Sequence, residues 1–266
     1  MVKIFFLSFS LIILVTGCRL KNNKSEVEIK NTREIYENIF GEKYLVANGS
    51  LLNIGKDSIE NGLWQYTSLE RRFVLFGDYS NGFPTGTWTF LQSGGTGFTS
   101  QWDIYSNSVR PCAFSVPFVL KDSVIDARIS KLTTMNDSLG KITIIVSVDD
   151  KLFSEQEVDE FNSQSDLGIR EQGYTYSGNH KKFRKGENEY FFDEYFLKDS
   201  LNKTAKLYRL YGNDPQKNFF VQFTLFHAGP KEDLVKVIYS LMVTSLYIDR
   251  SRFLNPYVLS NLISIK

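Results

Sequence analysis

Cysteine and histidine are scarce in this sequence, and neither sign of charge dominates it. The 266 residues include two cysteines and two histidines, and 31 basic residues nearly balance 30 acidic ones, for a formal net charge of +1. A balanced charge gives no field that would attract nucleic acid, so we expect no nucleic-acid partner. The few cysteines and histidines lack the spacing of a zinc site, and we predict neither a metal nor a cofactor.

Long apolar runs are also scarce, and the longest lies at the N-terminus. Residues 4–15 (IFFLSFSLIILV) are mostly apolar over 12 positions. As a helix this run would span only ~18 Å of a ~30 Å hydrocarbon core, which is too short for a stable transmembrane helix. It follows Lys3 and ends in small residues before Cys18, which is the layout of a signal peptide.

The segment Val15-Thr-Gly-Cys18 resembles the lipobox of bacterial lipoproteins. The resemblance implies cleavage before Cys18, removal of residues 1–17 and a lipid on the Cys18 sulfur, which with further acylation would anchor the chain to a membrane. An ordinary secretory signal with a coincidental cysteine is the alternative. In enterobacterial lipoproteins an aspartate after the lipidated residue favours the inner membrane, so Arg19 implies the outer membrane of a diderm bacterium.

Residues 18–43 are rich in Lys, Asn and Glu, and we expect a flexible lipidated tether with a short helix over residues 31–40. Lipid on Cys18 would leave Cys112 as a single thiol, so no structural disulfide is expected. The surroundings of Cys112, Pro111-Cys-Ala-Phe-Ser-Val-Pro117, predict a small buried apolar residue.

Residues 44–106 contain an internal repeat. Gly62-Leu-Trp-Gln-Tyr66 returns 24 positions later as Gly86-Thr-Trp-Thr-Phe90, and Asn-Gly pairs nearby favour tight turns. We predict a row of β-hairpins with Trp102 in a degenerate third unit. These motifs resemble the MORN-type repeats of bacterial surface proteins, and the resemblance implies hairpins stacked into a twisted meander.

The three tryptophans of this region, Trp64, Trp88 and Trp102, allow two interpretations. In the favoured one they pack between neighbouring hairpins, so that their side chains are buried. In the other they form an exposed aromatic platform that binds peptide or glycan.

Residues 107–266 predict an α+β domain with an antiparallel sheet flanked by helices. Ser154-Glu-Gln-Glu157 is a capping box for a helix that reaches about Asp166, and Pro230 opens a second helix. Strands are expected at residues 114–120, 141–148, 189–197, 205–211 and 218–227. This order, with Phe114-Ser-Val-Pro near its start, resembles the PsbP and Mog1 type of α/β sandwich, whose members mostly bind or scaffold other proteins.

Candidate chemical groups in this half have simple structural interpretations. Neighbouring carboxylates at 149–150 and 193–194 should point to opposite faces of a strand and be solvated. His180 should lie in an exposed loop, and His227 should make a hydrogen bond in a turn. The basic stretch 180–185 should form a solvated loop, or else contact a lipid headgroup or an acidic partner.

The sequence favours a non-enzymatic function. The first hypothesis is a membrane-anchored lipoprotein that binds or scaffolds an envelope protein or a surface polymer. Its candidate binding surface comprises the three tryptophans, Trp64, Trp88 and Trp102, together with the basic residues Lys181, Lys182 and Arg184. The second is a lipoprotein hydrolase whose catalytic residues come together only in the fold, since no catalytic motif is visible.

Overall fold

A computed structural model describes most of the chain after the tether. The described residues are 28–32, 35–37, 43–46, 49–54, 57–68, 73–93, 97–107, 112–117, 120–124, 129–134, 139–185, 188–198, 204–214, 218–248 and 251–253. The predicted signal peptide and Cys18 lie outside these ranges, and so does most of the predicted tether. Within these ranges no helix is both long enough and apolar enough to span a membrane.

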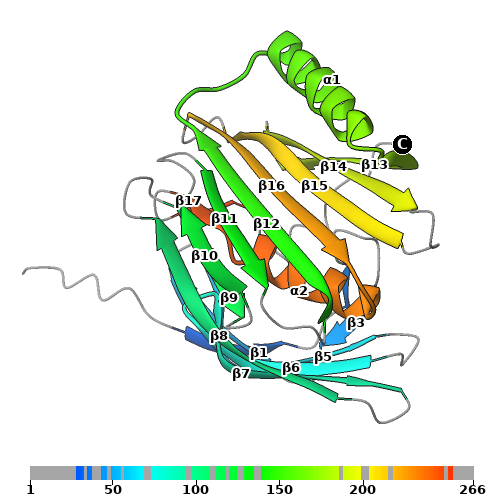
Figure 1. Cartoon of the computed structure of the whole chain (residues 1–266). Helices are drawn as coiled ribbons and strands as arrows, with labels where there is room; N and C mark the ends of the chain where they lie inside the picture. The colour runs from blue at the N-terminus through cyan, green and yellow to red at the C-terminus, as the bar shows by residue number, and fades with distance from the viewer. Residues whose placement is uncertain are drawn as a thin grey trace, which may run out of the picture.

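The first part of the chain and two short strands from its far end form a curled antiparallel sheet of 11 described strands (Figure 1). Its order is β1-β4-β5-β6-β7-β8-β9-β17-β18, with β3 on β5 and β2 on β3. The strands are β1 (Glu28–Thr32), β2 (Ile35–Glu37), β3 (Lys43–Val46), β4 (Gly49–Ile54), β5 (Asp57–Ser68), β6 (Phe73–Ser80), β7 (Phe83–Gln92), β8 (Gly97–Asn107), β9 (Cys112–Pro117), β17 (Tyr247–Ile248) and β18 (Ser251–Arg252).

Strands β1 and β2 replace the helix expected over residues 31–40, so that prediction is wrong. β1 pairs antiparallel with β4, and β2 pairs antiparallel with β3. A ten-residue segment gains little from an isolated helix in water, whereas pairing with an existing sheet satisfies its backbone groups. Long-range pairing has therefore overridden a weak local pattern.

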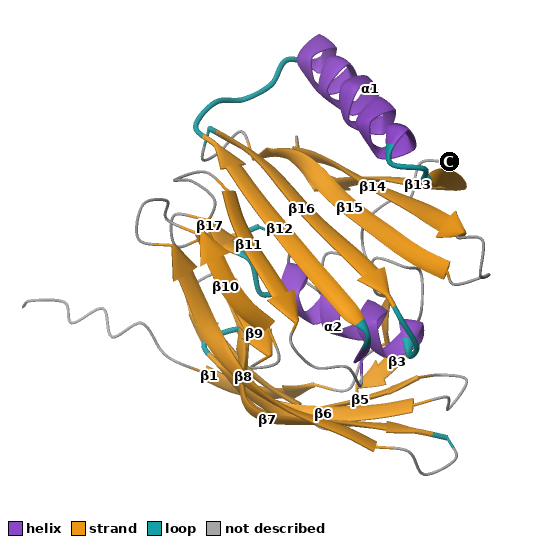
Figure 2. Cartoon of the chain, viewed as in Figure 1, coloured by secondary structure: helices purple, strands orange, loops and turns teal. Residues whose placement is uncertain are grey.

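The second sheet has seven described strands, which pair antiparallel throughout (Figure 2). Its order is β10-β11-β12-β16-β15-β14-β13. The strands are β10 (Leu120–Val124), β11 (Ile129–Thr134), β12 (Lys141–Asp149), β13 (Thr175–Lys185), β14 (Asn188–Lys198), β15 (Thr204–Asp214) and β16 (Phe219–Ala228). The antiparallel sheet predicted for this half is confirmed, and β13 occupies the stretch that was expected to be a basic loop.

Helix α1 (Glu155–Glu171) lies on the outer face of the second sheet (Figure 1). Its predicted capping box is present. The Glu157 backbone N–H donates to Ser154 Oγ at 3.2 Å, and the Ser154 N–H donates to Glu157 Oε2 at 2.8 Å. These local bonds satisfy backbone donors that a helix start otherwise leaves free, which explains why the sequence alone located this end.

Helix α2 (Glu232–Thr244) lies between the two sheets (Figure 1). Ten of its residues are buried, and side chains from both sheets and from α2 belong to one apolar cluster. Phe114 of β9 packs edge-on against Phe223 of β16 with ring centroids 5.4 Å apart. A helix covered on both sides needs apolar residues around its circumference, as the sequence of α2 has.

The change from the first sheet to the second comes after Pro117, later than the domain boundary expected at residue 107. β9 pairs with β8 and, on its other side, with β17 from the far end of the chain. The Ser115 N–H also donates to Ser245 Oγ at 2.9 Å. The described fold therefore consists of mostly antiparallel sheets with two helices, and its two sheets share one core.

Candidate functional site

The predicted Gly-x-Trp repeat has a common geometry at both of its clear units. Gly62 and Gly86 have positive φ values of 72° and 67°, which glycine adopts without steric strain. Trp64 Nε1 donates to the Ser50 carbonyl at 3.1 Å, and Trp88 Nε1 donates to the Asp78 carbonyl at 3.2 Å. In each unit, the residue whose carbonyl accepts this hydrogen bond directly follows a glycine. The indole ring packs against that glycine so closely that a Cβ there would clash with it.

The tryptophans lie in the core, so their candidate role in a binding surface is wrong. Trp64, Trp88 and Trp102 are 1%, 0% and 2% exposed. Tyr66 lies between the first two, with its ring centroid 5.9 Å from that of Trp64 and 6.3 Å from that of Trp88. The packing interpretation is confirmed, because a ligand could not reach these rings without unfolding the sheet.

The basic candidates lie on the edge strand β13 and not in a loop. Lys181 and Lys182 are half-buried. Lys182 Nζ lies 2.7 Å from Glu189 Oε2 and 5.4 Å from the centroid of the Phe191 ring. The side chain of Arg184 lies outside the described residues. Lys182 is thus neutralised within the chain, which weakens its attraction for an acidic partner.

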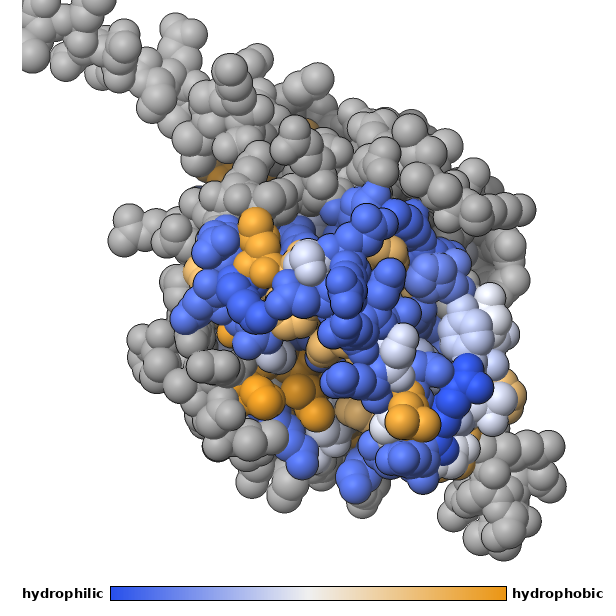
Figure 3. Space-filling view, turned by 90° about the horizontal axis from the view of Figure 1, so that it is seen from above, coloured by the Kyte–Doolittle hydropathy of each residue, from blue (hydrophilic) through white to orange (hydrophobic). Residues whose placement is uncertain are grey.

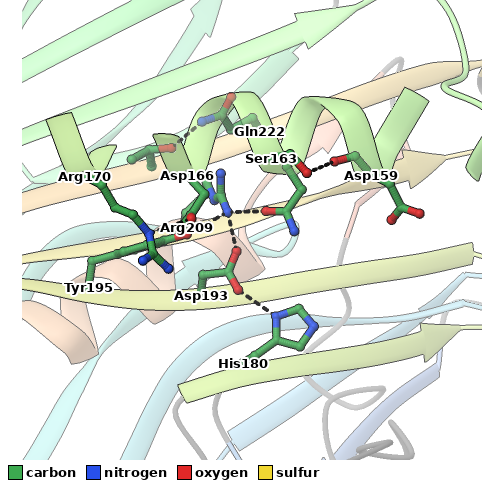
Figure 4. A network of polar contacts seen from close by, with 11 residues as sticks. Asp159, Ser163, Asp166, Arg170, His180, Asp193, Tyr195, Arg209 and Gln222 are labelled. Carbon is green, nitrogen blue, oxygen red and sulfur yellow. Dashed lines mark hydrogen bonds and ion pairs between the residues drawn. The ribbon is translucent and has the colours of Figure 1, made fainter. Parts of the chain in front are cut away.

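A row of polar residues that the sequence did not reveal crosses the outer face of the second sheet beneath α1 (Figure 4). His180 of β13 lies opposite Asp193 of β14, and Asp193 lies opposite Arg209 of β15. Residues opposite each other on antiparallel strands project from the same face, so the register alone aligns these three side chains.

Arg209 is the centre of this network. Its side chain is 0% exposed, and its Nη2 donates to Asp193 Oδ2 at 2.6 Å, to Asn162 Oδ1 of α1 at 2.6 Å and to Tyr195 Oη at 3.0 Å. The guanidinium carbon lies 4.7 Å from the centroid of the Tyr211 ring, within the range of cation–π attraction. A buried charge of this kind is tolerated because an opposite charge and several acceptors surround it.

Asp193 carries the opposite charge and joins Arg209 to the surface. Its Oδ1 accepts a hydrogen bond from His180 Nδ1 at 2.6 Å, and the His180 side chain is 43% exposed. Burial alone would raise the pKa of Asp193, but the His180 hydrogen bond and the Arg209 charge lower it below its usual value. His180 is exposed, as predicted, but it lies on strand β13 and not in a loop. The prediction that Asp193 is solvated is wrong, because Asp193 is buried.

Two nitrogens of Arg209, Nε and Nη1, have no hydrogen-bond partner among the described residues. An unsatisfied buried donor costs about 1–3 kcal/mol, and more when it is charged. Buried polar groups with unmet hydrogen-bonding capacity are uncommon in folded proteins, and a functional role is one reason for them. Arg209 therefore retains capacity for a further hydrogen-bond acceptor.

Glu194 belongs to a different cluster, on the inner side of the sheet. As predicted, it points away from Asp193, but it is only 9% exposed and not solvated. Lys206 Nζ lies 3.5 Å from Glu194 Oε1 and 3.7 Å from Glu232 Oε1 of α2. Tyr208 Oη donates to Glu232 at 3.1 Å. Burial opposes ionisation of Glu232, but Lys236 and Lys206 lower its pKa. This cluster attaches the start of α2 to the sheet.

The other candidate reactive groups have structural roles. Burial raises the pKa of the Cys112 thiol to about 12, which keeps the thiol protonated at neutral pH. The ring of His227 is buried and its Nε2 donates to the Leu139 carbonyl at 3.0 Å, so the hydrogen bond predicted for His227 is confirmed. Among the described residues, no group of three metal-ligating side chains comes together.

The surface around α1 is mainly hydrophilic. Figure 3 looks down on this side of the molecule and shows separate apolar patches among polar residues. The outward side of the helix carries a polar and acidic hollow, lined by Glu155, Gln156, Asp159, Glu160, Ser163 and Gln164. The polar row is therefore covered by a helix whose outer side interacts with solvent.

Comparison with known proteins gives only a structural likeness. The chain matches neither a protein-family model nor a curated protein. It is similar to the Ran-binding protein Mog1p of Saccharomyces cerevisiae, with a TM-score of 0.41 and 11% identity over 56% of this chain and 96% of that one. It is similar to cyanobacterial PsbP (CyanoP) from Synechocystis sp. PCC 6803, with a TM-score of 0.41 and 15% identity over 59% of this chain and 97% of that one. The fold thus has a weak likeness to Mog1 and PsbP proteins.

Proposed function

We propose that this protein is a membrane-anchored lipoprotein that binds or scaffolds an envelope protein or a surface polymer. The sequence at residues 15–18 carries the anchoring part of the proposal, with lipid on Cys18. β1 begins at Glu28, so the chain between Cys18 and the first sheet can extend at most ~35 Å. A lipid at Cys18 would keep the folded part within that reach of the bilayer, on the outer membrane if the source is a diderm.

The binding part of the proposal is supported by how the reactive groups are used. His180, His227 and Cys112 each have a structural partner or a buried position, and the Arg209 network places a charge beneath a covering helix. We also assign the two Gly-x-Trp hairpins to MORN-type units, because Trp64 and Trp88 repeat the same contacts. In this assignment the repeat is a scaffold, and the binding surface lies on the second sheet.

Replacement of Cys18 tests the anchor. Cys18→Ala should abolish incorporation of an alkyne-tagged fatty acid and leave an unprocessed or soluble species, whereas Cys112→Ala should still be labelled and found in the membrane. If Cys18→Ala comigrates with the mature wild type and stays in the membrane fraction, the lipoprotein assignment is wrong.

A hydrolase is the second candidate, and one observation favours it. Glu194 and Glu232 share Lys206 between their carboxylates, and paired carboxylates can act as acid and base in hydrolysis. Lys236 also lies 3.1 Å from Glu232 and neutralises the pair further. Release of nitrophenol from ester or glycoside substrates by the wild type, with loss in Glu232→Gln, would favour this candidate over the binding protein.

A further inference from the structure

Helix α1 has far fewer buried residues than helix α2, and this difference points to mobility of α1. In α2, ten of 13 residues are buried, whereas in the 17 residues of α1 only Val158 and Ile169 are buried. Leu167 of α1 is 59% exposed. An element with few buried apolar contacts opens at lower free energy than the core, so we expect α1 to separate from the sheet more readily than α2 does.

The sheet face beneath α1 has two apolar ends and a charged centre. At one end Val158 packs in a cluster with Tyr211 and Phe220, and the ring centroids of Phe161 and Phe220 lie 4.9 Å apart. At the other end Ile169 packs with Tyr195 and Leu207. The guanidinium of Arg209 lies between these clusters. This face therefore fits an amphipathic helix with apolar residues near both ends and a hydrogen-bond acceptor at its centre.

Helix α1 fills the central position incompletely. Asn162 offers Arg209 one neutral amide oxygen, while Nε and Nη1 of Arg209 have no partner among the described residues. A carboxylate at the same place would bring two oxygens and a negative charge, and charge-assisted hydrogen bonds are roughly twice as strong as neutral ones. The other carboxylate oxygen of Asp193, Oδ1, already accepts a hydrogen bond from His180. A helix with an acidic residue opposite Arg209 would thus suit this face better than α1 does.

We propose that α1 is a displaceable cover, and that the face beneath it binds an amphipathic helix of a partner protein with Asp or Glu opposite Arg209. The inference rests on the proposed binding function and assigns it a site and a class of partner. α1 is the internal competitor of that helix. Weakening α1 should then strengthen binding, because the apparent affinity scales with the fraction of molecules whose site is open.

A labelled peptide tests this competition in the full-length protein. The probe is residues 152–172 with Asn162→Asp, measured by fluorescence anisotropy against the unsubstituted peptide. Phe161→Ala in the protein should tighten binding of the Asp peptide about tenfold relative to wild type. Leu167→Ala is the matched control on the exposed side of α1 and should leave the affinity unchanged. Arg209→Lys, which keeps the charge but loses the planar fork, should remove the preference for the Asp peptide.

The outcomes separate this inference from the proposed function. The three tryptophans lie in the first sheet, away from α1, so their fluorescence shows whether each variant keeps its core. Equal binding by wild type and a folded Phe161→Ala protein, or no binding to either, overturns the inference. Crosslinking in native membranes gives a second test. If wild type and Phe161→Ala capture one defined partner to the same extent, the inference about α1 is overturned, but the binding function is supported. Capture of no partner by either protein argues against the binding function itself.

Discussion

Truncation of Trp88 to alanine should remove a large part of the stability of the first sheet. Trp88 is 0% exposed, and its ring centroid lies 5.3 Å from that of Tyr79 and 6.3 Å from that of Trp102. Its Nε1 also donates to the Asp78 carbonyl. The indole rests against Gly77, whose neighbouring backbone cannot collapse far into the space that alanine would leave. Substitutions of this kind cost about 3–5 kcal/mol.

This cost is large relative to the ~5–15 kcal/mol by which most domains are stable. One kcal/mol shifts the melting temperature by ~2–4 °C in a protein of this size, so a shift of at least ~6 °C is expected. Urea denaturation followed by circular dichroism measures the change without relying on the fluorophore that is removed.

Two comparisons make this prediction specific. Trp64→Ala should cost a similar amount, because Trp64 has the equivalent glycine contact and carbonyl hydrogen bond. Leu63→Ala is the control on the same strand, and since Leu63 is 58% exposed its free energy of unfolding should change by less than ~0.5 kcal/mol. Near-neutral results for both tryptophans would refute the assignment of these residues to the core.

Four further predictions concern the shared core and the polar networks. Residues 112–266 expressed alone should show no cooperative thermal transition, because they lack β8, the partner of β9. The pKa of Asp193 is lowered in the folded protein. Its stabilising contribution is therefore present above its unfolded pKa of ~3.9 and is lost as the pH falls through its folded pKa. The difference in unfolding free energy between wild type and Asp193→Asn should accordingly shrink in acid. Cys112 should resist thiol reagents at pH 8 until the protein unfolds, as a raised pKa and burial require. Amide hydrogens of α1 should exchange faster than those of α2 in mass spectrometry, and equal rates would contradict a loosely held α1.

Local features of the fold were predictable because their causes lie within a few residues. The capping box needs only Ser154 and Glu157, and the start of α1 follows from it. The Gly-x-Trp units were visible because each combines a positive-φ glycine with a tryptophan at fixed spacing. The strand β12 was visible from its alternating apolar residues, which are buried on one face.

Features that depend on distant parts of the chain were missed for a physical reason. The domain boundary expected at residue 107 came from a change in composition, but β9 pairs with β8 before it and with β17 about 130 residues later. Register between strands cannot be derived from alternation alone, because slipping by two residues preserves the same faces. The row of His180, Asp193 and Arg209 exists in one register only.

A partial signal for the missed site was present in the sequence. Arg209 interrupts the run Leu207-Tyr-Arg-Leu-Tyr211, and a single charge inside an otherwise apolar run implies a buried partner. The sequence could not show which acid pairs with Arg209, since both Asp193 and Glu194 lie in the neighbouring strand β14. Only the alternation of side chains on a pleated strand, combined with the register, assigns Asp193 to Arg209.

The same alternation links the two helices through one strand. On β14, Asp193 projects toward Arg209 and α1, while its neighbour Glu194 projects toward Lys206 of β15, which also contacts Glu232 at the start of α2. The α1 side rests on two small clusters and a polar centre, whereas the α2 side belongs to the main core. Because the main core spans both sheets without α1, separation of α1 would expose only the outer face. This asymmetry explains how one face can exchange its cover while the sandwich and its predicted lipid anchor remain in place.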